Sequence, residues 1–308
     1  MLLEERGNIM SEKKYSSGDV IFFEGDAGNS FFEIIEGTVG IYVNYNGVNQ
    51  RMLTELGEGK YFGELAVIDS TPRSTTVIAV TDVTVNEIPE EKLYEFFEND
   101  PNRILEIMNH IGSRIRALTN EYADANSFYK EFIEIGSDQK SESFMSKLKK
   151  YIEIYSAAKK NLKTPSVEAL RESSGKLSDS ALYMETYPKG TIIFKEGETG
   201  KCMYAIHGGS VGIYSDFGTP SEKKLTQLVP GEFFGEMGMI AEEKRSATAV
   251  VEEDNTFVEI IKPDDLKELL ESNPSEVDMI LIHLSHRLRK LTDDYMAICK
   301  KIYDAYNK

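Results

Sequence analysis

The sequence is poor in the residues that secreted and membrane-spanning proteins need. Its 308 residues include two cysteines, Cys202 and Cys299, which lie far apart and share no motif. We therefore expect neither a disulfide framework nor a cysteine metal site. No apolar run approaches the roughly 18 residues of a membrane-spanning helix, and the N-terminus lacks the basic and long apolar segments of a signal peptide. These absences predict a soluble protein that stays in the cytoplasm.

Histidine is equally scarce, which weakens the case for an enzyme. The only four are His110, His207, His283 and His286, with no His-x-His pair, whereas barrel enzymes of the cupin type hold a metal with clustered histidines and a carboxylate. The sequence also has no Gly-x-Ser-x-Gly motif, no P-loop and no Cys/His pairing. We expect no catalytic residues, no metal site and no cofactor, and a cupin-like enzyme finds little support.

Basic residues are outnumbered by acidic ones. The chain has 35 Lys and Arg against 52 Asp and Glu, a formal net charge of −17. Such a charge repels the DNA backbone, whose neutralisation by basic side chains supplies most non-specific affinity. A phosphate ligand would also be repelled unless a local positive site were organised for it. We therefore expect no DNA binding. An isolated arginine in a glycine-rich loop would be a candidate for such a local phosphate site.

The chain repeats itself at a fixed offset. Positions from Tyr15 to Ser74 recur 172 residues later, with no net insertion or deletion between those ends. A repeat of this length indicates duplicated domains rather than a solenoid. The recurring residues are Tyr15, Gly18, Glu24, Gly25, Gly28, Gly37, Val39, Gly40, Ile41, Tyr42, Leu53, Gly59, Phe62, Gly63, Glu64, Arg73 and Ser74, matched by Tyr187, Gly190, Glu196, Gly197, Gly200, Gly209, Val211, Gly212, Ile213, Tyr214, Leu225, Gly231, Phe234, Gly235, Glu236, Arg245 and Ser246.

Short β-type runs fill each copy. In the first they are residues 20–23, 31–35, 39–43, 75–79 and 83–85, rich in β-branched and aromatic side chains and separated by Gly, Asp and Asn. This pattern predicts an antiparallel barrel or jelly roll.

Helical spacing follows each β-rich part. Apolar residues alternate four and three positions apart, which predicts a long helix after each barrel. Two interpretations stay open: the stripes dock onto the protein's own barrels, or they form a dimerising coiled coil. The first stripe is Ile104, Met108, Ile111, Ile115, Leu118, Tyr122, Ala125 and Tyr129, and the second is Ile280, Leu284, Leu288, Leu291, Tyr295, Ile298 and Ile302.

The expected fold is mainly β with α, as two jelly rolls joined by a helical linker. The predicted domains are residues 1–125, with a C-terminal helix, and residues 187–308, with another; the linker is 126–186. Within it, a basic amphipathic helix is expected to pack against acidic neighbours, although binding to a partner or an anionic membrane surface is the alternative. Its apolar positions are Phe144, Leu148, Tyr151, Ile152 and Tyr155.

The chemistry concentrates in one segment of each copy, residues 61–77 and 233–249. In both, a Gly-Glu pair precedes an Arg-Ser pair, and Glu and Arg stand nine residues apart. Since the residues between the pairs differ from copy to copy, the spacing and the ends are what the two segments share. We name these segments the first and second cassettes.

The residues of the first cassette suit a phosphate joined to a sugar. Gly63 allows close backbone approach, and a short helical turn starting there would aim N–H groups at an anion. Arg73 can hold two phosphate oxygens with its planar fork, and Ser74 can donate another hydrogen bond. Glu64 suits a sugar hydroxyl. The alternative is a structural ion pair between Glu and Arg, which recurrence in both copies disfavours.

These motifs resemble the phosphate-binding cassette of cyclic-nucleotide-binding domains, as in bacterial catabolite-activator-type regulators and the regulatory subunit of protein kinase A. The resemblance covers about residues 15–125 and 187–300 and implies eight-stranded jelly rolls that bind cAMP or cGMP as a ligand. It also implies a final helix acting as a lid, with Tyr122 and Tyr295 as candidate base caps. The implied ligand-binding residues are Gly63, Glu64, Leu65, Ala66, Arg73, Ser74 and Thr75 in site one, and Gly235, Glu236, Met237, Gly238, Arg245, Ser246 and Ala247 in site two.

The sequence departs from these relatives in its ends and its second site. Neither a helix-turn-helix after the second barrel nor an inhibitor segment before the first is expected. We therefore predict a sensor that changes conformation on binding and regulates an unknown protein partner. The long helices offer a surface for a homodimer, and an empty scaffold is the alternative function. Met237 and Gly238 replace Leu65 and Ala66, and two further glutamates add negative charge, so site two is expected to bind more weakly.

Overall fold

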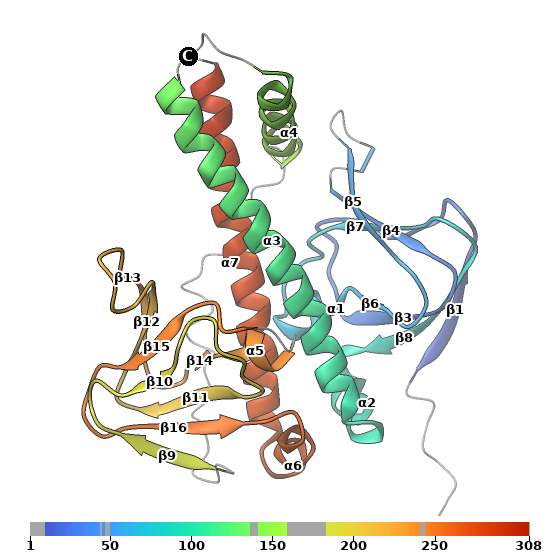
Figure 1. Ribbon diagram of the computed structural model, residues 1–308. Coiled ribbons are helices and arrows are strands. Elements are labelled where there is room, and N and C mark those ends of the chain that lie inside the picture. The colour runs from blue at the N-terminus through green and yellow to red at the C-terminus, as the bar shows by residue number, and fades with distance from the viewer. Residues whose placement is uncertain are drawn as a thin grey trace, which may run out of the picture. The chain divides into compact units, whose positions relative to one another are not determined.

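The computed structural model describes residues 10–43, 45–46, 50–135, 141–158, 183–240 and 244–307. It divides the chain into two compact units. The first comprises residues 1–96, 114–165 and 285–308, and the second comprises residues 97–113 and 166–284. Each unit contains one copy of the repeat together with parts of the long helices (Figure 1).

The first copy is built from eight strands. They are β1 (Ser11–Tyr15), β2 (Val20–Phe22), β3 (Ser30–Glu36), β4 (Val39–Val43), β5 (Arg51–Leu56), β6 (Tyr61–Phe62), β7 (Thr76–Ala79) and β8 (Val83–Pro89). They form two four-stranded antiparallel sheets with the orders β1-β8-β3-β6 and β2-β7-β4-β5. The core takes apolar side chains from both sheets, among them Phe32, Val39, Phe62, Val77 and Val85.

The second copy repeats this topology. Its strands are β9 (Met184–Tyr187), β10 (Ile192–Phe194), β11 (Met203–Gly208), β12 (Val211–Ser215), β13 (Lys223–Leu228), β14 (Phe233–Phe234), β15 (Thr248–Val251) and β16 (Thr256–Ile261). The sheet orders are β14-β11-β16-β9 and β10-β15-β12-β13, and Phe194, Ile206, Val211, Phe234 and Val258 lie in the core. The prediction of a mainly β fold with two jelly rolls is confirmed.

Eight helices accompany the strands among the described residues. They are α1 (Glu64–Ile68), the 3-10 turn η1 (Glu90–Lys92), α2 (Leu93–Asn99), α3 (Asn102–Ile135), α4 (Glu142–Ala158), α5 (Glu236–Ile240), α6 (Asp265–Ser272) and α7 (Pro274–Tyr306). Both long helices, α3 and α7, begin at a proline or directly after one, Pro101 and Pro274. Proline suits a helix start because its missing N–H has no intrahelical acceptor there.

The apolar stripes of the long helices are largely buried within the chain. In the first unit, residues from α3, α4 and α7 share one core that includes Ala125, Phe128, Leu148, Tyr151 and Ile302. Their burial favours docking within the chain over an exposed coiled-coil seam, while the homodimer stays a prediction. Helix α3 runs on to Ile135, past residue 125, because Phe128 and Phe132 continue its stripe into this core.

Two strands whose side chains face water, β1 and β5, were not predicted. Almost every residue of β1 and β5 is exposed, so neither shows the apolar run by which a strand is recognised. The two copies also differ by one residue in the turn before β8 and β16. Ile34 pairs with Val85 whereas Ile206 pairs with Val258, so the offset is 173 beyond that turn.

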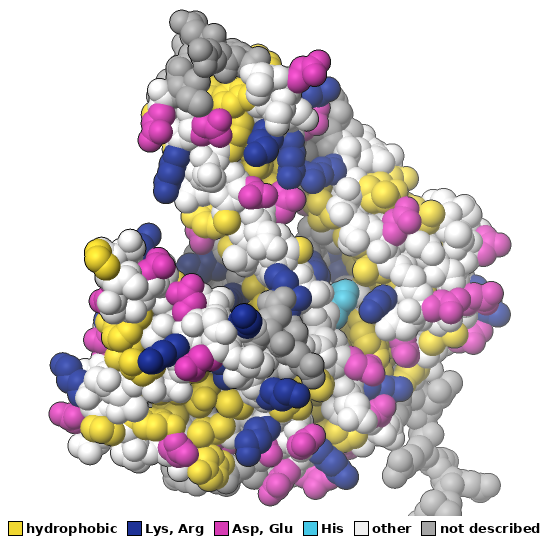
Figure 2. Space-filling view, in the orientation of Figure 1, with side chains coloured by type: hydrophobic (Ala, Val, Ile, Leu, Met, Phe, Trp, Pro, Cys, Tyr) yellow, Lys and Arg dark blue, Asp and Glu magenta, His cyan; other side chains and the backbone are white. Residues whose placement is uncertain are grey.

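The surface carries both signs of charge. On the face drawn in Figure 2, acidic side chains are interspersed with Lys and Arg rather than separated from them. None of the helices that the structure describes has the length and apolar character needed to cross a membrane. Most of the predicted linker beyond α4 lies outside the described residues.

Candidate functional site

Glycine fixes the entry to the first cassette. Strand β6 ends at Phe62, and Gly63 follows with φ of +78°, a conformation that other residues rarely adopt. A Cβ at Gly63 would lie 2.6 Å from Nη1 of Arg73. The glycine therefore permits both the turn into α1 and the close approach of the arginine.

The backbone of Arg73 is held by a turn between β2 and β3. Its N–H donates to Asp26 O and its carbonyl accepts from the N–H of Gly25, both at 2.9 Å. Gly25 has φ of +89°. The second copy repeats this exchange, since the N–H of Arg245 donates to Glu198 O and its carbonyl accepts from the N–H of Gly197. This explains why the Glu-Gly turn recurs with the cassette.

The side chain of Arg73 is buried but incompletely bonded. It is 5% exposed, Nη1 donates to the carbonyl of Gly63 at 2.7 Å, and the guanidinium lies 4.2 Å from the ring centre of Phe22. Burial lowers the pKa of Arg73, while the carboxylates of Glu64, Asp26 and Glu87 oppose that shift. Its Nε has no hydrogen-bond partner among the described residues. A buried charged donor of this kind is suited to an anionic ligand.

Glu64 bonds outside its own loop. Its carboxylate is 2% exposed and accepts from Nη1 of Arg114, on α3, at 2.8 Å. No ion pair joins Glu64 to Arg73 among the described residues. The structural alternative, a Glu–Arg pair that closes the loop, is therefore wrong for the first cassette.

The other predicted residues of site one adjoin Glu64 and Arg73 in the chain. Leu65 and Ala66 are buried in α1, Ser74 is exposed, and Thr75 is half-buried just before β7. A Cβ at Gly28 would lie 2.4 Å from Cβ of Ala66 and 3.0 Å from Nε of Arg73. Gly28 was part of the repeat but was not predicted as a site residue, although its recurrence as Gly200 was a usable signal.

The second cassette has the same frame. Gly235 has φ of +75°, and Arg245 is 5% exposed, donates from Nη1 to the carbonyl of Gly235 and stacks 4.2 Å from the ring centre of Phe194. Nε of Arg245 also lacks a hydrogen-bond partner among the described residues. Of the remaining predicted residues, Glu236, Gly238 and Ala247 are buried, Met237 is half-buried and Ser246 is exposed.

Cys202 distinguishes the second cassette. Nη2 of Arg245 donates to the Cys202 carbonyl at 2.9 Å and lies 3.7 Å from its Sγ. Gly238 makes this position accessible, because a Cβ there would lie 2.7 Å from Nη1 of Arg245 and 2.9 Å from the carbonyl of Gly200. The contact with Cys202 was not predicted, because no local motif links residues 43 positions apart. The two glutamates expected to add charge, Glu242 and Glu243, lie outside the described residues.

The first cassette is also tied to α7. Asp69, directly after α1, accepts from Oγ of Ser285 at 2.6 Å and from Nη2 of Arg289 at 3.0 Å, and Arg289 also donates to Thr71. The side chain of Asp69 is fully buried. Burial alone would raise its pKa, but the guanidinium and the hydroxyls hold the pKa below its ordinary value.

The two predicted base caps pack in the helical core of the first unit. Tyr295 is 7% exposed, and its hydroxyl donates to Glu121 at 3.1 Å. Glu121 also accepts from Nζ of Lys150 at 2.6 Å, and burial raises the pKa of Tyr295. Tyr122 is partly buried against the same core. Their role as caps stays a prediction.

Comparison with known proteins agrees with the geometry of both cassettes. Residues 12–100 and 184–273 match the family described as "Cyclic nucleotide-binding domain". The chain belongs to this family. Each copy of the repeat is thus a cyclic-nucleotide-binding domain, and the recognition made from the cassette motifs is confirmed.

Two curated relatives and one solved structure illustrate the similarity. The chain is 31% identical over 239 residues to a cAMP-dependent protein kinase regulatory subunit of Debaryomyces hansenii, covering 78% of this chain and 40% of the relative. It is 27% identical over 246 residues to a cGMP-dependent protein kinase of Toxoplasma gondii, covering 80% and 19%. A cAMP co-crystal structure of the regulatory domain of Toxoplasma gondii PKA is 19% identical, with a TM-score of 0.29 and coverage of 87% and 86%. The chain therefore spans less than half of either curated relative.

Proposed function

We propose that this chain is a cyclic-nucleotide sensor that binds cAMP or cGMP at both cassettes and regulates a protein partner. The observation that carries the proposal is the paired arrangement of Arg73 and Arg245. Each is buried, is oriented by a glycine carbonyl and keeps Nε without a protein acceptor among the described residues. An anionic ligand would supply the missing acceptors.

In the first site the proposed roles follow the chemistry of each group. Arg73 holds phosphate oxygens, and the hydroxyls of Ser74 and Thr75 donate to the same phosphate. Glu64 accepts a hydrogen bond from a sugar hydroxyl, with Arg114 fixing the carboxylate. Leu65 and Ala66 lie at the start of α1 beside the ligand. Each charge-assisted contact would contribute about 1.5–3 kcal/mol.

The second site would bind through Gly235, Glu236, Met237, Gly238, Arg245, Ser246 and Ala247. Its affinity should be lower, because Arg245 already donates to the carbonyls of Gly235 and Cys202 and a phosphate must compete with these acceptors. Ser74 and Ser246 leave the base preference open, with cAMP slightly favoured. The relatives' names include both a cAMP-dependent kinase subunit and a cGMP-dependent kinase, which favours a protein kinase as the partner.

Transmission of ligand binding would run through the long helices. In the first unit, α3 reaches the cassette through the Arg114–Glu64 pair and α7 reaches it through the Arg289–Asp69 pair. A ligand that bonds to Glu64 changes the first contact and thereby shifts the population of helix positions. Small-angle scattering with and without saturating cyclic nucleotide tests this step, and identical curves would refute it.

Isothermal titration calorimetry tests the binding proposal directly. Wild type, Arg73→Ala and Arg245→Ala are titrated with cAMP, cGMP and a cyclic dinucleotide. We expect two sites in the wild type, the first tighter, and a loss of about 100-fold or more at site one in Arg73→Ala, since at least two charge-assisted contacts disappear. Arg245→Ala should affect site two alone.

Two variants keep this experiment interpretable. Arg51→Ala removes an exposed arginine from β5 of the same copy and should leave binding unchanged. Arg73→Lys keeps the buried charge but loses the planar fork, so it should fold and bind weakly. Unchanged affinity in a folded Arg73→Ala protein would refute the phosphate contact, and wild type that binds neither nucleotide would favour the scaffold alternative.

A further inference from the structure

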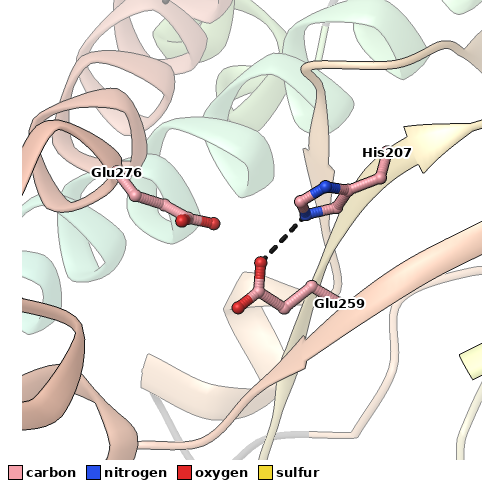
Figure 3. A group of neighbouring side chains, drawn as sticks. All are labelled: His207, Glu259 and Glu276. Atoms are coloured by element: carbon pink, nitrogen blue, oxygen red, sulfur yellow. Dashed lines mark hydrogen bonds and ion pairs between the residues drawn. The ribbon is translucent and has the colours of Figure 1, made fainter. Parts of the chain in front are cut away.

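Three side chains converge inside the second domain, away from the cassette. They are His207 on β11, Glu259 on β16 and Glu276 in the first turn of α7 (Figure 3). Nε2 of His207 lies 2.9 Å from Oε2 of Glu259. One ligand atom from each of the three residues can be chosen so that all lie within 4.8 Å of one another. Figure 3 shows the Glu276 carboxylate directed toward the other two.

The cluster is buried. Glu259 is 0% exposed, Glu276 is 1% exposed, and the His207 side chain is 8% exposed. Oε2 of Glu276 accepts from Nδ2 of Asn273 at 2.6 Å, whereas its Oε1 is buried without a hydrogen-bond partner among the described residues. Burial and the neighbouring Glu259 carboxylate raise the pKa of Glu276 to about 8. Two carboxylates in one dry site need either a shared proton or a cation.

We propose that His207, Glu259 and Glu276 bind a divalent transition-metal ion of the Zn²⁺ type. An imidazole nitrogen with two carboxylate oxygens is a donor set that suits Zn²⁺, with water as a fourth ligand, and it does not suit the all-oxygen preference of Mg²⁺ or Ca²⁺. Metal–ligand bonds of about 2.0–2.1 Å place tetrahedral ligands about 3.4 Å apart. A separation of 4.8 Å would therefore have to close by about 1.4 Å.

The first domain does not repeat this donor set. Glu259 pairs with Ala205 across the sheet, as Asn86 pairs with Glu33, so Asn86 is its counterpart. Aligning Pro274 with Pro101 places Arg103 at the position of Glu276. His207 corresponds to Ile35 by the repeat offset. The first domain thus has an amide, a permanent cation and an apolar side chain where the second has three groups able to coordinate a metal.

A bound metal would act on the helix rather than on the nucleotide. It would join β11 and β16 to the first turn of α7 through three bonds. The start of α7 would then be fixed to the sheet of its own domain. No short motif marks this set in the sequence, because its residues come from three elements spread over 70 positions.

Titration of the chelator-treated full chain with ZnCl₂, followed by calorimetry, tests the proposal. We expect one Zn²⁺ per chain and no comparable Mg²⁺ binding. Loss of a ligand in His207→Gln or Glu276→Gln should weaken Zn²⁺ binding by at least about tenfold, since even outer-shell changes cost 10–100-fold. Substitution with Co²⁺ should give visible d–d absorption in wild type that Glu276→Gln loses.

The control addresses adventitious binding by the histidines of α7, which are partly buried. His283 and His286 lie three residues apart on α7, so His286→Gln should leave Zn²⁺ affinity unchanged. Zn²⁺ should raise the thermal midpoint of wild type but not that of Glu276→Gln. The metal-free midpoint of Glu276→Gln should not fall, because glutamine keeps the volume and an oxygen that can accept from Asn273. Absence of Zn²⁺ binding, wild-type binding by Glu276→Gln, or loss of binding in His286→Gln would each overturn the proposal.

Discussion

The two cassettes share a backbone frame but differ in what holds each arginine. The side chain of Arg73 donates one hydrogen bond to protein among the described residues, to the Gly63 carbonyl. The side chain of Arg245 donates to two carbonyls and approaches a sulfur. Ala66 is the counterpart of Gly238, where a Cβ would lie 2.7 Å from Nη1 of Arg245. A phosphate must therefore displace more protein acceptors from the side chain of Arg245 than from that of Arg73.

The cassettes also differ in their link to the helices. The residue after the α1 turn is Asp69 in the first copy and Ala241 in the second. Only a side chain with a carboxylate can accept hydrogen bonds as Asp69 does from Ser285 and Arg289. The first cassette is therefore joined to α7 by an ion pair. The second cassette has alanine where the first has the Asp69 carboxylate.

The largest expected effect on stability comes from breaking this ion pair. Arg289→Ala leaves the buried Asp69 carboxylate without its cation and should lower the free energy of unfolding by about 3–5 kcal/mol at neutral pH. Chemical denaturation measures it, with the exposed neighbour Lys290→Ala as the control. Equal stability of Arg289→Ala and wild type would remove the proposed difference between the cassettes.

The same variant predicts a pH dependence. The pKa of Asp69 is lowered on folding, so its stabilising contribution is present above its ordinary pKa and is lost as pH falls through the folded value. The loss of unfolding free energy in Arg289→Ala should therefore be largest near neutral pH and shrink below about pH 4. A loss that does not change across this window would contradict the assignment to Asp69.

An exchange of Ala66 and Gly238 gives a smaller effect. Gly238→Ala places a Cβ against Arg245 and the backbone of Gly200, and such overpacking should cost about 1–3 kcal/mol. Ala66→Gly should cost about 0.5–1 kcal/mol, through backbone entropy. Denaturant unfolding of both variants measures this asymmetry, and equal costs would show that the two arginines have equivalent surroundings.

Cys202→Ala should produce the smallest effect. It removes the weak contact between Sγ and Nη2 of Arg245 but keeps the carbonyl that accepts at 2.9 Å. Ligand affinity at site two should rise by about threefold or less, which corresponds to less than 1 kcal/mol. Calorimetry with Cys202→Ser, which retains an acceptor, is the matched comparison. A tenfold change would mean that the sulfur, not the carbonyl, sets the position of Arg245.

The sequence was sufficient for the repeated frame but not for the partners of its charged residues. The recurring glycines, the Glu/Arg spacing and the β-type runs predicted two jelly rolls with matched cassettes, because close backbone approach and buried strands leave periodic signals. The contacts of Arg114, Arg289 and Cys202 with the cassettes were not predicted, because they join residues 43 to 220 positions apart. Nothing in local spacing encodes which distant side chain will reach a buried carboxylate.

The separation between Asp69 and Arg289 also matters during synthesis of the chain. The two residues lie 220 positions apart, and translation at about 5–20 residues per second takes roughly 10–40 seconds to cover that length. Throughout this interval the first cassette would hold a carboxylate whose guanidinium partner has not yet left the ribosome. The first cassette can therefore complete its pairing of Asp69 only after Arg289 has emerged from the ribosome.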